Sequence, residues 1–151
     1  MDGAVTSTAG DVTAAAKNAV TTAKAVKANK NVIITSTDGV VHTKGTVTAE
    51  EENVTVNAKQ GRTTDGAVQA KKNVTLTSEA GAINANSTVT EETGDIEATA
   101  KGNVTTSGKL SAAGGAITVT SDTGNIEVGA DATAKNNVAC IGSNGDCSTR
   151  C

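Results

Sequence analysis

Residues 43–63 read TKGTVTAEEENVTVNAKQGRT, and residues 64–84 read TDGAVQAKKNVTLTSEAGAIN. The second stretch repeats the order of turn residues, apolar residues and threonines of the first, with a period of about 21 residues that is typical of repeat proteins. When the chain is written from Met1 in rows of one period, the same columns appear along its whole length. Repeats of this kind are typical of solenoids, in which each repeat is a coil that stacks on its neighbours. The period predicts about seven coils.

Three columns of these rows hold branched apolar residues. They contain Val5, Val26, Val47, Val68, Val89 and Leu110; Val12, Ile33, Val54, Ile96, Ile117 and Val138; and Val20, Val41, Ile83, Val104 and, displaced by one place, Ile126. Arg62 interrupts the third column. Each row therefore contains three short apolar–polar alternations, which predict three short β-strands per coil with these columns facing inward.

Turn-forming residues separate the three alternations of each row. The corner columns contain Gly3, Gly45, Gly66, Gly108 and Gly129; Gly10, Asn31, Asn73, Gly94, Gly115 and Asn136; and Asn18, Gly39, Gly81, Gly102 and, one place late, Gly124. Gly and Asn tolerate left-handed backbone angles, so we expect such angles at the corners. Parallel pairing between equivalent strands predicts an all-β fold, a single-stranded parallel β-helix (β-solenoid) over residues 1–139, with a cysteine-containing tail at 140–151.

The composition is consistent with a narrow core. The chain has 151 residues and contains no Phe, Tyr, Trp or Pro, so small aliphatic side chains must fill the interior. Such residues can pack a thin core to native density, but not a wide one. Residues 13–30 are rich in Ala and Lys, which favour helices, and a helical cap is the alternative there. Val20 and Val26 lie in phase with the later rows and favour strands.

The charges argue against two classes of partner. The 13 basic and 16 acidic residues are interspersed and give a net charge of −3, which does not suit binding to nucleic acid or an anionic membrane. No apolar run approaches the roughly 18 residues of a membrane span, so we expect no direct membrane insertion. The start, MDGAVTSTAG, lacks a signal-peptide pattern, which leaves a cytosolic protein or a processed fragment of a longer one.

Charged residues follow the same period. One column contains Lys30, Glu51, Lys72 and, one place early, Glu92; a second contains Lys17, Asp38, Lys59, Ala80, Lys101 and Asp122. Opposite charges on adjacent strands attract by about 0.2–1 kcal/mol per pair, and like charges repel. We expect both columns to form charge ladders that favour one stacking register.

All three cysteines, Cys140, Cys147 and Cys151, lie in the last twelve residues. A disulfide between Cys140 and Cys147 would close a turn-rich loop and would need an oxidising compartment, while Cys151 could pair between chains. Free thiols and a metal site are the alternatives. The only histidine, His42, lies about five rows away, and no spacing matches a zinc finger.

The remaining polar residues predict no catalytic site and no cofactor. His42 is expected to be a solvated surface residue, and acidic neighbours such as Glu91 and Glu92 are expected to lie opposite lysines in the ladders. The corners are too short to build a cleft, so we expect no enzyme. Four N-glycosylation sequons begin at Asn53, Asn73, Asn86 and Asn103 and are mostly by-products of the repeat.

Thr-x-Thr pairs recur, for example Thr75/Thr77 and Thr118/Thr120. Regular threonine ladders on a flat solenoid face are how some antifreeze proteins meet ice. In strict rows of one period, however, the column that contains Thr6, Thr48 and Thr90 is interrupted by Lys27, Gln69 and Ser111. Threonine as an ordinary outward strand residue is therefore preferred. A ladder of Thr, Asn or Asp over four or more coils would favour the alternative function, a face that binds glycan or ice.

Four phrases, GDVTAAAKN, NVTLTSEAGAI, GDIEATAKGNVT and GAITVTSDTGNIEV, resemble the repeats of filamentous-haemagglutinin-like adhesins and toxin stalks of bacterial two-partner secretion. The resemblance covers nearly the whole chain and implies a right-handed parallel β-helix that projects from the outer membrane as a rigid fibre. The segment ACIGSNGDC resembles the cysteine-bounded loop that ends the high-molecular-weight adhesins and retains the fibre at the surface. Cys140 and Cys147 occupy the matching positions.

These features predict a structural fibre or stalk module of a bacterial surface adhesin, located outside the cell or on its outer surface. Bare terminal coils expose strand edges that a second copy can extend, so we expect end-to-end stacking, locked by Cys151. The expected partners are other copies of the chain and host or bacterial surface components.

Overall fold

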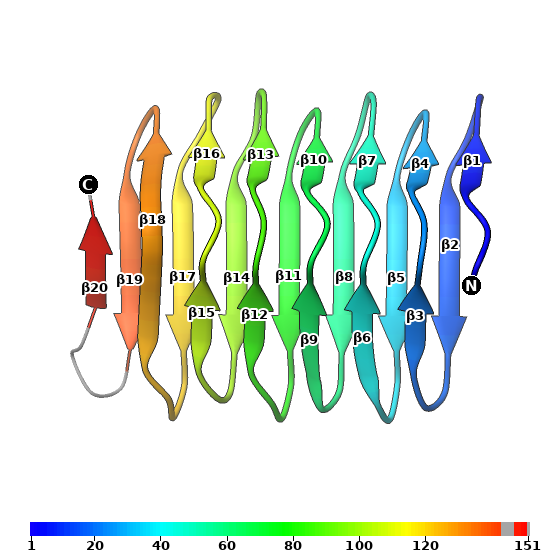
Figure 1. The fold of residues 1–151 in the computed structure, drawn as a ribbon. Helices are drawn as coiled ribbons and strands as arrows, with labels where there is room; N and C mark the ends of the chain where they lie inside the picture. Colours follow the sequence, from blue (N-terminus) through cyan, green and yellow to red (C-terminus); the bar gives the residue numbers. More distant parts are fainter. Residues whose placement is uncertain (143–146, 151) are drawn as a thin grey trace.

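The computed structural model describes residues 1–142 and, for the backbone alone, residues 147–150. The described chain is a β-solenoid of about seven coils without a helix, in which each strand pairs in parallel with its equivalent in the neighbouring coils (Figure 1). This confirms the all-β solenoid and its repeat. Residues 13–30 form strands and connecting corners rather than a helix, so the helical cap is wrong.

Each coil contains three strands, and the strands form two sheets. The first strands are β1 (Val5–Ser7), β4 (Val26–Ala28), β7 (Val47–Ala49), β10 (Val68–Ala70), β13 (Val89–Glu91) and β16 (Leu110–Ala112). The middle strands are β2 (Val12–Ala16), β5 (Val32–Ser36), β8 (Val54–Ala58), β11 (Val74–Ser78), β14 (Ile96–Ala100), β17 (Ile117–Ser121) and β19 (Val138–Gly142). The third strands are β3 (Val20–Thr22), β6 (Val40–Thr43), β9 (Gly61–Thr64), β12 (Ile83–Ala85) and β15 (Val104–Thr106).

The long strand β18 (Ile126–Ala134) is the third strand of one coil and continues as the first strand of the next. It joins the first and third strands into one 13-stranded sheet, while the middle strands form a separate seven-stranded sheet. Strand β20 (Cys147–Arg150) pairs with β18. Parallel pairing therefore continues past residue 139, where we expected the solenoid to end. Backbone pairing alone extends the solenoid through β19 and β20, whatever the side chains of this segment are.

A column of aliphatic side chains from each row of strands fills the interior. Val54, Leu76 and Ile83 are among the fully buried residues, and the buried apolar cluster is continuous along the rod. Burying a Val, Leu or Ile side chain contributes about 1.5–3 kcal/mol, so these columns supply most of the stabilisation that the fold can obtain.

The middle sheet departs from the strict periodic columns. Between β2 and β14 the step from one middle strand to its equivalent is alternately one residue shorter and one residue longer than the period. Val32 and Val74 are therefore buried, whereas Ile33, which we expected to face inward, pairs with Thr13 and Thr55 and faces outward. The corner before the middle strand is one residue shorter in every second coil there, and the next corner is one residue longer, so each coil keeps its length.

The corners do not use left-handed backbone angles, contrary to our expectation. Among the described residues no side-chain-bearing residue has a positive φ, and only one glycine does, Gly61 at +155°. Glycine is needed at some of the corners because stacked coils approach closely there. A Cβ atom on Gly39 would lie 1.3 Å from the carbonyl oxygen of Asn18, and one on Gly81 would lie 1.4 Å from that of Gln60.

Candidate functional site

Side chains of Asn and Asp connect successive coils at the corner before the middle strand. This Asx ladder consists of Asp11, Asn31, Asn53, Asn73 and Asp95. The Oδ1 atom of each member accepts a hydrogen bond from the backbone N–H of the next, at 2.8–3.2 Å. Asp95 accepts the N–H of Ala116 in the same way, at 2.8 Å.

The ladder explains why Asn and Asp occur at these corners. A backbone N–H that faces the preceding coil would otherwise lack a partner, and an unpaired peptide donor is costly. The side-chain amides of Asn31 and Asn53 also donate to the preceding Oδ1, at 3.0 and 3.2 Å. The backbone N–H and the amide of Asn31 lower the pKa of Asp11. Sequence reasoning placed Asn31 and Asn73 at corners but assigned them to backbone angles rather than to contacts between coils. It noted Asn53 only as a sequon and missed Asp11 and Asp95.

Asn53→Ala is expected to lower the free energy of unfolding by about 1–2 kcal/mol, because the N–H of Asn73 and the Oδ1 of Asn31 both lose a partner. Urea unfolding followed by circular dichroism measures the change as a lower midpoint with an unchanged m-value. Asn57→Ala is the matched control, since the Asn57 side chain makes no hydrogen bond to the described residues. Equal losses in both variants would contradict a role for the ladder.

Ion pairs join neighbouring coils, although mostly not between the expected partners. Lys17 pairs with Asp38 at 3.9 Å, as the second charge column predicts. Lys59 pairs with Glu79 at 2.7 Å rather than with Asp38, and the Glu79 carboxylate raises the pKa of Lys59.

The first charge column is wrong in its pairing. Lys72 pairs with Glu52 at 2.8 Å rather than with Glu51, and Glu92 pairs with Lys71 rather than with Lys72. The corners of successive coils differ in length, which moves charged residues by one place relative to a strict column. The members without an ion-pair partner within 4.0 Å among the described residues are Lys30, Glu51, Lys101 and Asp122. Exposed pairs of this kind contribute about 0–1 kcal/mol each.

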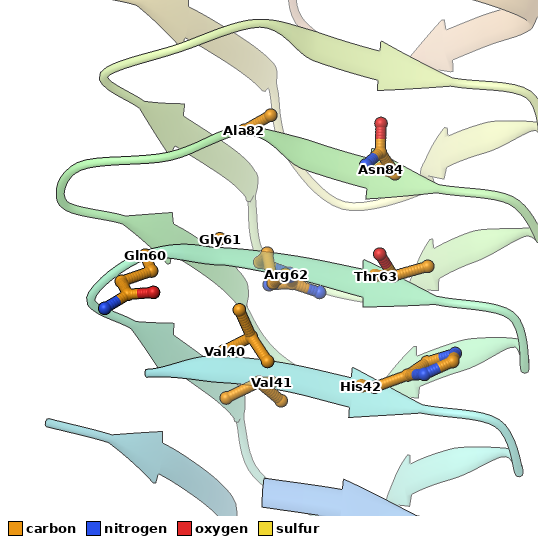
Figure 2. A pocket seen from close by; sticks show the side chains of 9 residues that line it. All are labelled: Val40, Val41, His42, Gln60, Gly61, Arg62, Thr63, Ala82 and Asn84. Atoms are coloured by element: carbon orange, nitrogen blue, oxygen red, sulfur yellow. The ribbon is translucent and has the colours of Figure 1, made fainter. Parts of the chain in front are cut away.

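A shallow groove of about 310 Å³ crosses the outer face of β6, β9 and β12 (Figure 2). Val40, Gly61 and Ala82 line it together with the polar side chains of Gln60 and Asn84. Other grooves of about 230–300 Å³ lie elsewhere on the solenoid, so its size does not distinguish it.

His42 borders this groove at the surface, with its side chain 34% exposed, and it has a hydrogen-bond partner that the sequence did not predict. Its Nε2 atom lies 2.6 Å from Oδ2 of Asp65, and the amide of Asn86 donates to the other oxygen of Asp65 at 2.8 Å. These hydrogen bonds lower the pKa of Asp65. His42, Asp65 and Asn86 therefore link three successive coils at one corner.

Two ionisable side chains point into the aliphatic core. Arg62 is 2% exposed and takes the place of a branched residue between Val41 and Ile83. Its Nη1 atom donates weakly to the carbonyl of Val56 at 3.4 Å, and its Nε and Nη2 atoms have no hydrogen-bond partner among the described residues. Burial lowers the pKa of Arg62 to about 9.

Glu91 is fully buried, so its assignment to the surface charge ladder is wrong. It lies in a column that holds alanine in the neighbouring coils, Ala70 and Ala112. Its carboxylate accepts hydrogen bonds from the backbone N–H groups of Gly94 and, at 3.1 Å, Gly114. Strand alternation places Glu91 on the inner face beside Val89.

Cys140 and the sequon residues lie at or near coil contacts. Cys140 is half-buried in β19. The side chains of Cys147 and Cys151 lie outside the described residues, so the pairing stays a prediction. The sequon residues accept or donate hydrogen bonds between coils, and their glycosylation also stays a prediction; they are Asn53, Asn73, Asn86 and Asn103.

Neither a metal-binding cluster nor a membrane-spanning helix occurs among the described residues. Within this part of the chain no group of three or more His, Cys, Asp or Glu residues is placed to hold a metal ion. The same residues contain no helix with the length and apolar character needed to span a membrane.

Comparisons of the chain with known proteins found no match to a family model, a curated protein or a solved structure. The fold and the contacts between coils define a β-solenoid repeat protein. The resemblance to filamentous-haemagglutinin-like repeats stays a prediction.

Proposed function

We propose that this chain is a structural module, a stalk or fibre segment of a bacterial surface adhesin that extends by end-to-end stacking. It acts outside the cell, without a catalytic role, and its partners are other copies of itself and surface components of the host or the bacterium. The observation that supports this most directly is that the parallel backbone pairing repeats from coil to coil up to both terminal coils, and that the Asx ladder accompanies it from Asp11 to Ala116.

The two ends of the solenoid expose edge strands that run in the same direction, so one end can pair in parallel with the other end of a second copy. Strands β1 and β2 lie at one end of their sheets, and β19 lies at the other end of the middle sheet. An edge strand exposes unpaired backbone N–H and C=O groups that a further parallel strand can pair with. Part of the first end is covered, because the N-terminal amine donates to the carbonyl of Thr21 at 2.6 Å and Ala23 donates to the carbonyl of Met1 at 2.9 Å.

Asn137 places an Asx side chain at the C-terminal end of the solenoid, one coil beyond Ala116, where the ladder is interrupted. It holds the ladder position directly before β19, and its exposed side chain has no hydrogen-bond partner among the described residues. In every step of the ladder an Oδ1 atom accepts the N–H of the equivalent residue one coil further on. In a stacked pair the Oδ1 of Asn137 therefore accepts the N–H of Asp11 from a second copy.

The 151-residue chain is expected to form elongated particles whose length increases with protein concentration, visible by electron microscopy and by sedimentation velocity. Asn137→Ala removes the bridging acceptor and should weaken end-to-end association about tenfold. Asn57→Ala, which alters an Asn side chain on the outer face of the third coil, should leave it unchanged. A monomeric sedimentation profile at high concentration under oxidising conditions would overturn the proposal. If a reducing agent abolished the particles, a disulfide bond would be what holds the stacked copies together.

A further inference from the structure

The outer face of the seven-stranded middle sheet carries two straight ranks of side chains. The seven strands lie side by side along the rod (Figure 1), and residues of adjacent strands are in register. One rank contains Thr13, Ile33, Thr55, Thr75, Glu97, Thr118 and Ala139. The other contains Ala15, Thr35, Asn57, Thr77, Thr99, Thr120 and Ile141.

The second rank is an uninterrupted ladder of Thr and Asn over five coils, from Thr35 to Thr120. Strict rows of one period conceal it, because the middle strands shift by one place between coils. Glu97 is the only ionisable residue of the two ranks. The outward positions of the first strands lack this uniformity, since Lys27 lies between Thr6 and Thr48.

The threonine hydroxyl groups of this face are available to solvent. Thr99 donates to the carboxylate of Glu97 at 3.5 Å, and the other threonines of the two ranks make no hydrogen bond to the described residues. β-Branched side chains have restricted χ1 angles, so the array is stiff and loses little entropy when it binds. Its geometry is a lattice of about 4.8 Å between strands and roughly 6.6 Å between alternate residues of a strand.

We propose that this face, the outer surface of the middle sheet, binds ice. Oxygen rows in ice repeat at spacings of the same order as this lattice, so hydroxyl and methyl groups in register can hold a layer of water that merges with the crystal. A repeating flat array suits a repeating ligand. A single sugar or other small molecule is instead bound in concave pockets, often against aromatic rings, and the chain has no aromatic residue.

The test uses the 151-residue chain labelled with a fluorophore on its lysines, none of which lies in the two ranks. The labelled chain should be enriched in a slowly growing ice crystal and should lower the freezing temperature below the melting temperature in a nanolitre osmometer. Thr77→Lys, at the centre of the second rank, should abolish both effects. Thr105→Lys is the matched control, because Thr105 faces outward on β15 of the other sheet and should retain both effects.

A second experiment uses a variant that is expected to bind ice more strongly than the parent chain. Glu97→Thr removes the single charge of the array and should enlarge the gap between the melting and freezing temperatures. Far-UV circular dichroism and thermal melting confirm that each variant is folded. Exclusion of the parent chain from ice, equal losses in Thr77→Lys and Thr105→Lys, or an unaltered gap in Glu97→Thr would each overturn the proposal. Glycan binding that is lost in Thr77→Lys, without enrichment in ice, would reassign the face to carbohydrate. None of these outcomes bears on end-to-end stacking.

Discussion

Gly81→Ala is expected to disrupt the solenoid at its centre and to lower the free energy of unfolding by more than about 4 kcal/mol, an exceptional loss for one methyl group. Its Cβ atom would lie 1.4 Å from the carbonyl oxygen of Gln60 and 2.9 Å from the nitrogen of Gly61. The coils cannot separate to make room, because Ala80 donates to the carbonyl of Lys59 at 2.7 Å beside this contact. Thermal unfolding followed by circular dichroism should show a large fall in melting temperature.

Gly10→Ala is the control for this change. Gly10 also lies at a corner, but the nearest atom to an added Cβ is Oγ of Ser7 at 3.7 Å, an ordinary contact. Its free energy of unfolding should change by no more than about 0.5 kcal/mol. If both variants melted alike, the corner glycines would act through backbone freedom rather than through the close approach of coils.

Arg62→Ile is expected to stabilise the chain by about 1–4 kcal/mol, because a buried guanidinium with two unpaired nitrogens is replaced by the kind of residue that its column holds on either side. Urea unfolding near neutral pH measures the gain. Arg62→Met, which fills more of the vacated volume, separates the removal of charge from the creation of a cavity. A loss of stability in both variants would show that the buried cation has a partner that supports the fold.

The pH dependence of Arg62 gives an independent readout. Burial lowers the pKa of Arg62 from the ordinary value of arginine to about 9 in the folded chain. Below pH 9 both folded and unfolded chains carry the proton, so the destabilisation is complete at neutral pH. Between these two values the unfolded chain binds more protons, and the Arg62 contribution to stability rises with pH. The stability difference between the parent chain and Arg62→Ile should therefore narrow above pH 9. A constant difference would contradict the lowered pKa.

The coarse fold was predictable because each coil repeats the same alternation. Val26, Val47 and Val68 are one period apart, and the structure pairs them directly. The register of the middle sheet was not predictable, because a missing residue at one corner is restored at the next and leaves the period unchanged. Ile33 was therefore placed inside, and the partners of Lys59 and Lys72 were misassigned.

The columns of the periodic sequence also did not predict the contacts between coils. Gly, Asn and Ser are common in turns for several reasons, and a sequence does not say which reason applies. The distances show that Gly81 gives room to a neighbouring carbonyl and that Asn53 accepts a neighbouring N–H. Glu91 is buried because it lies on the inner face of β13, a position that its acidic neighbour Glu92 conceals in the sequence.

The period, the three strands per coil and the aliphatic core follow from the amino-acid sequence, since apolar burial at fixed spacing leaves few other folds for a chain without aromatic residues. Which residues of successive coils meet depends on how the coils stack in three dimensions. Stacking brings together backbone atoms one period apart, and a shift of one place at a corner turns an inward side chain outward. That shift aligns Thr35, Thr77 and Thr120 into one ladder on the middle sheet.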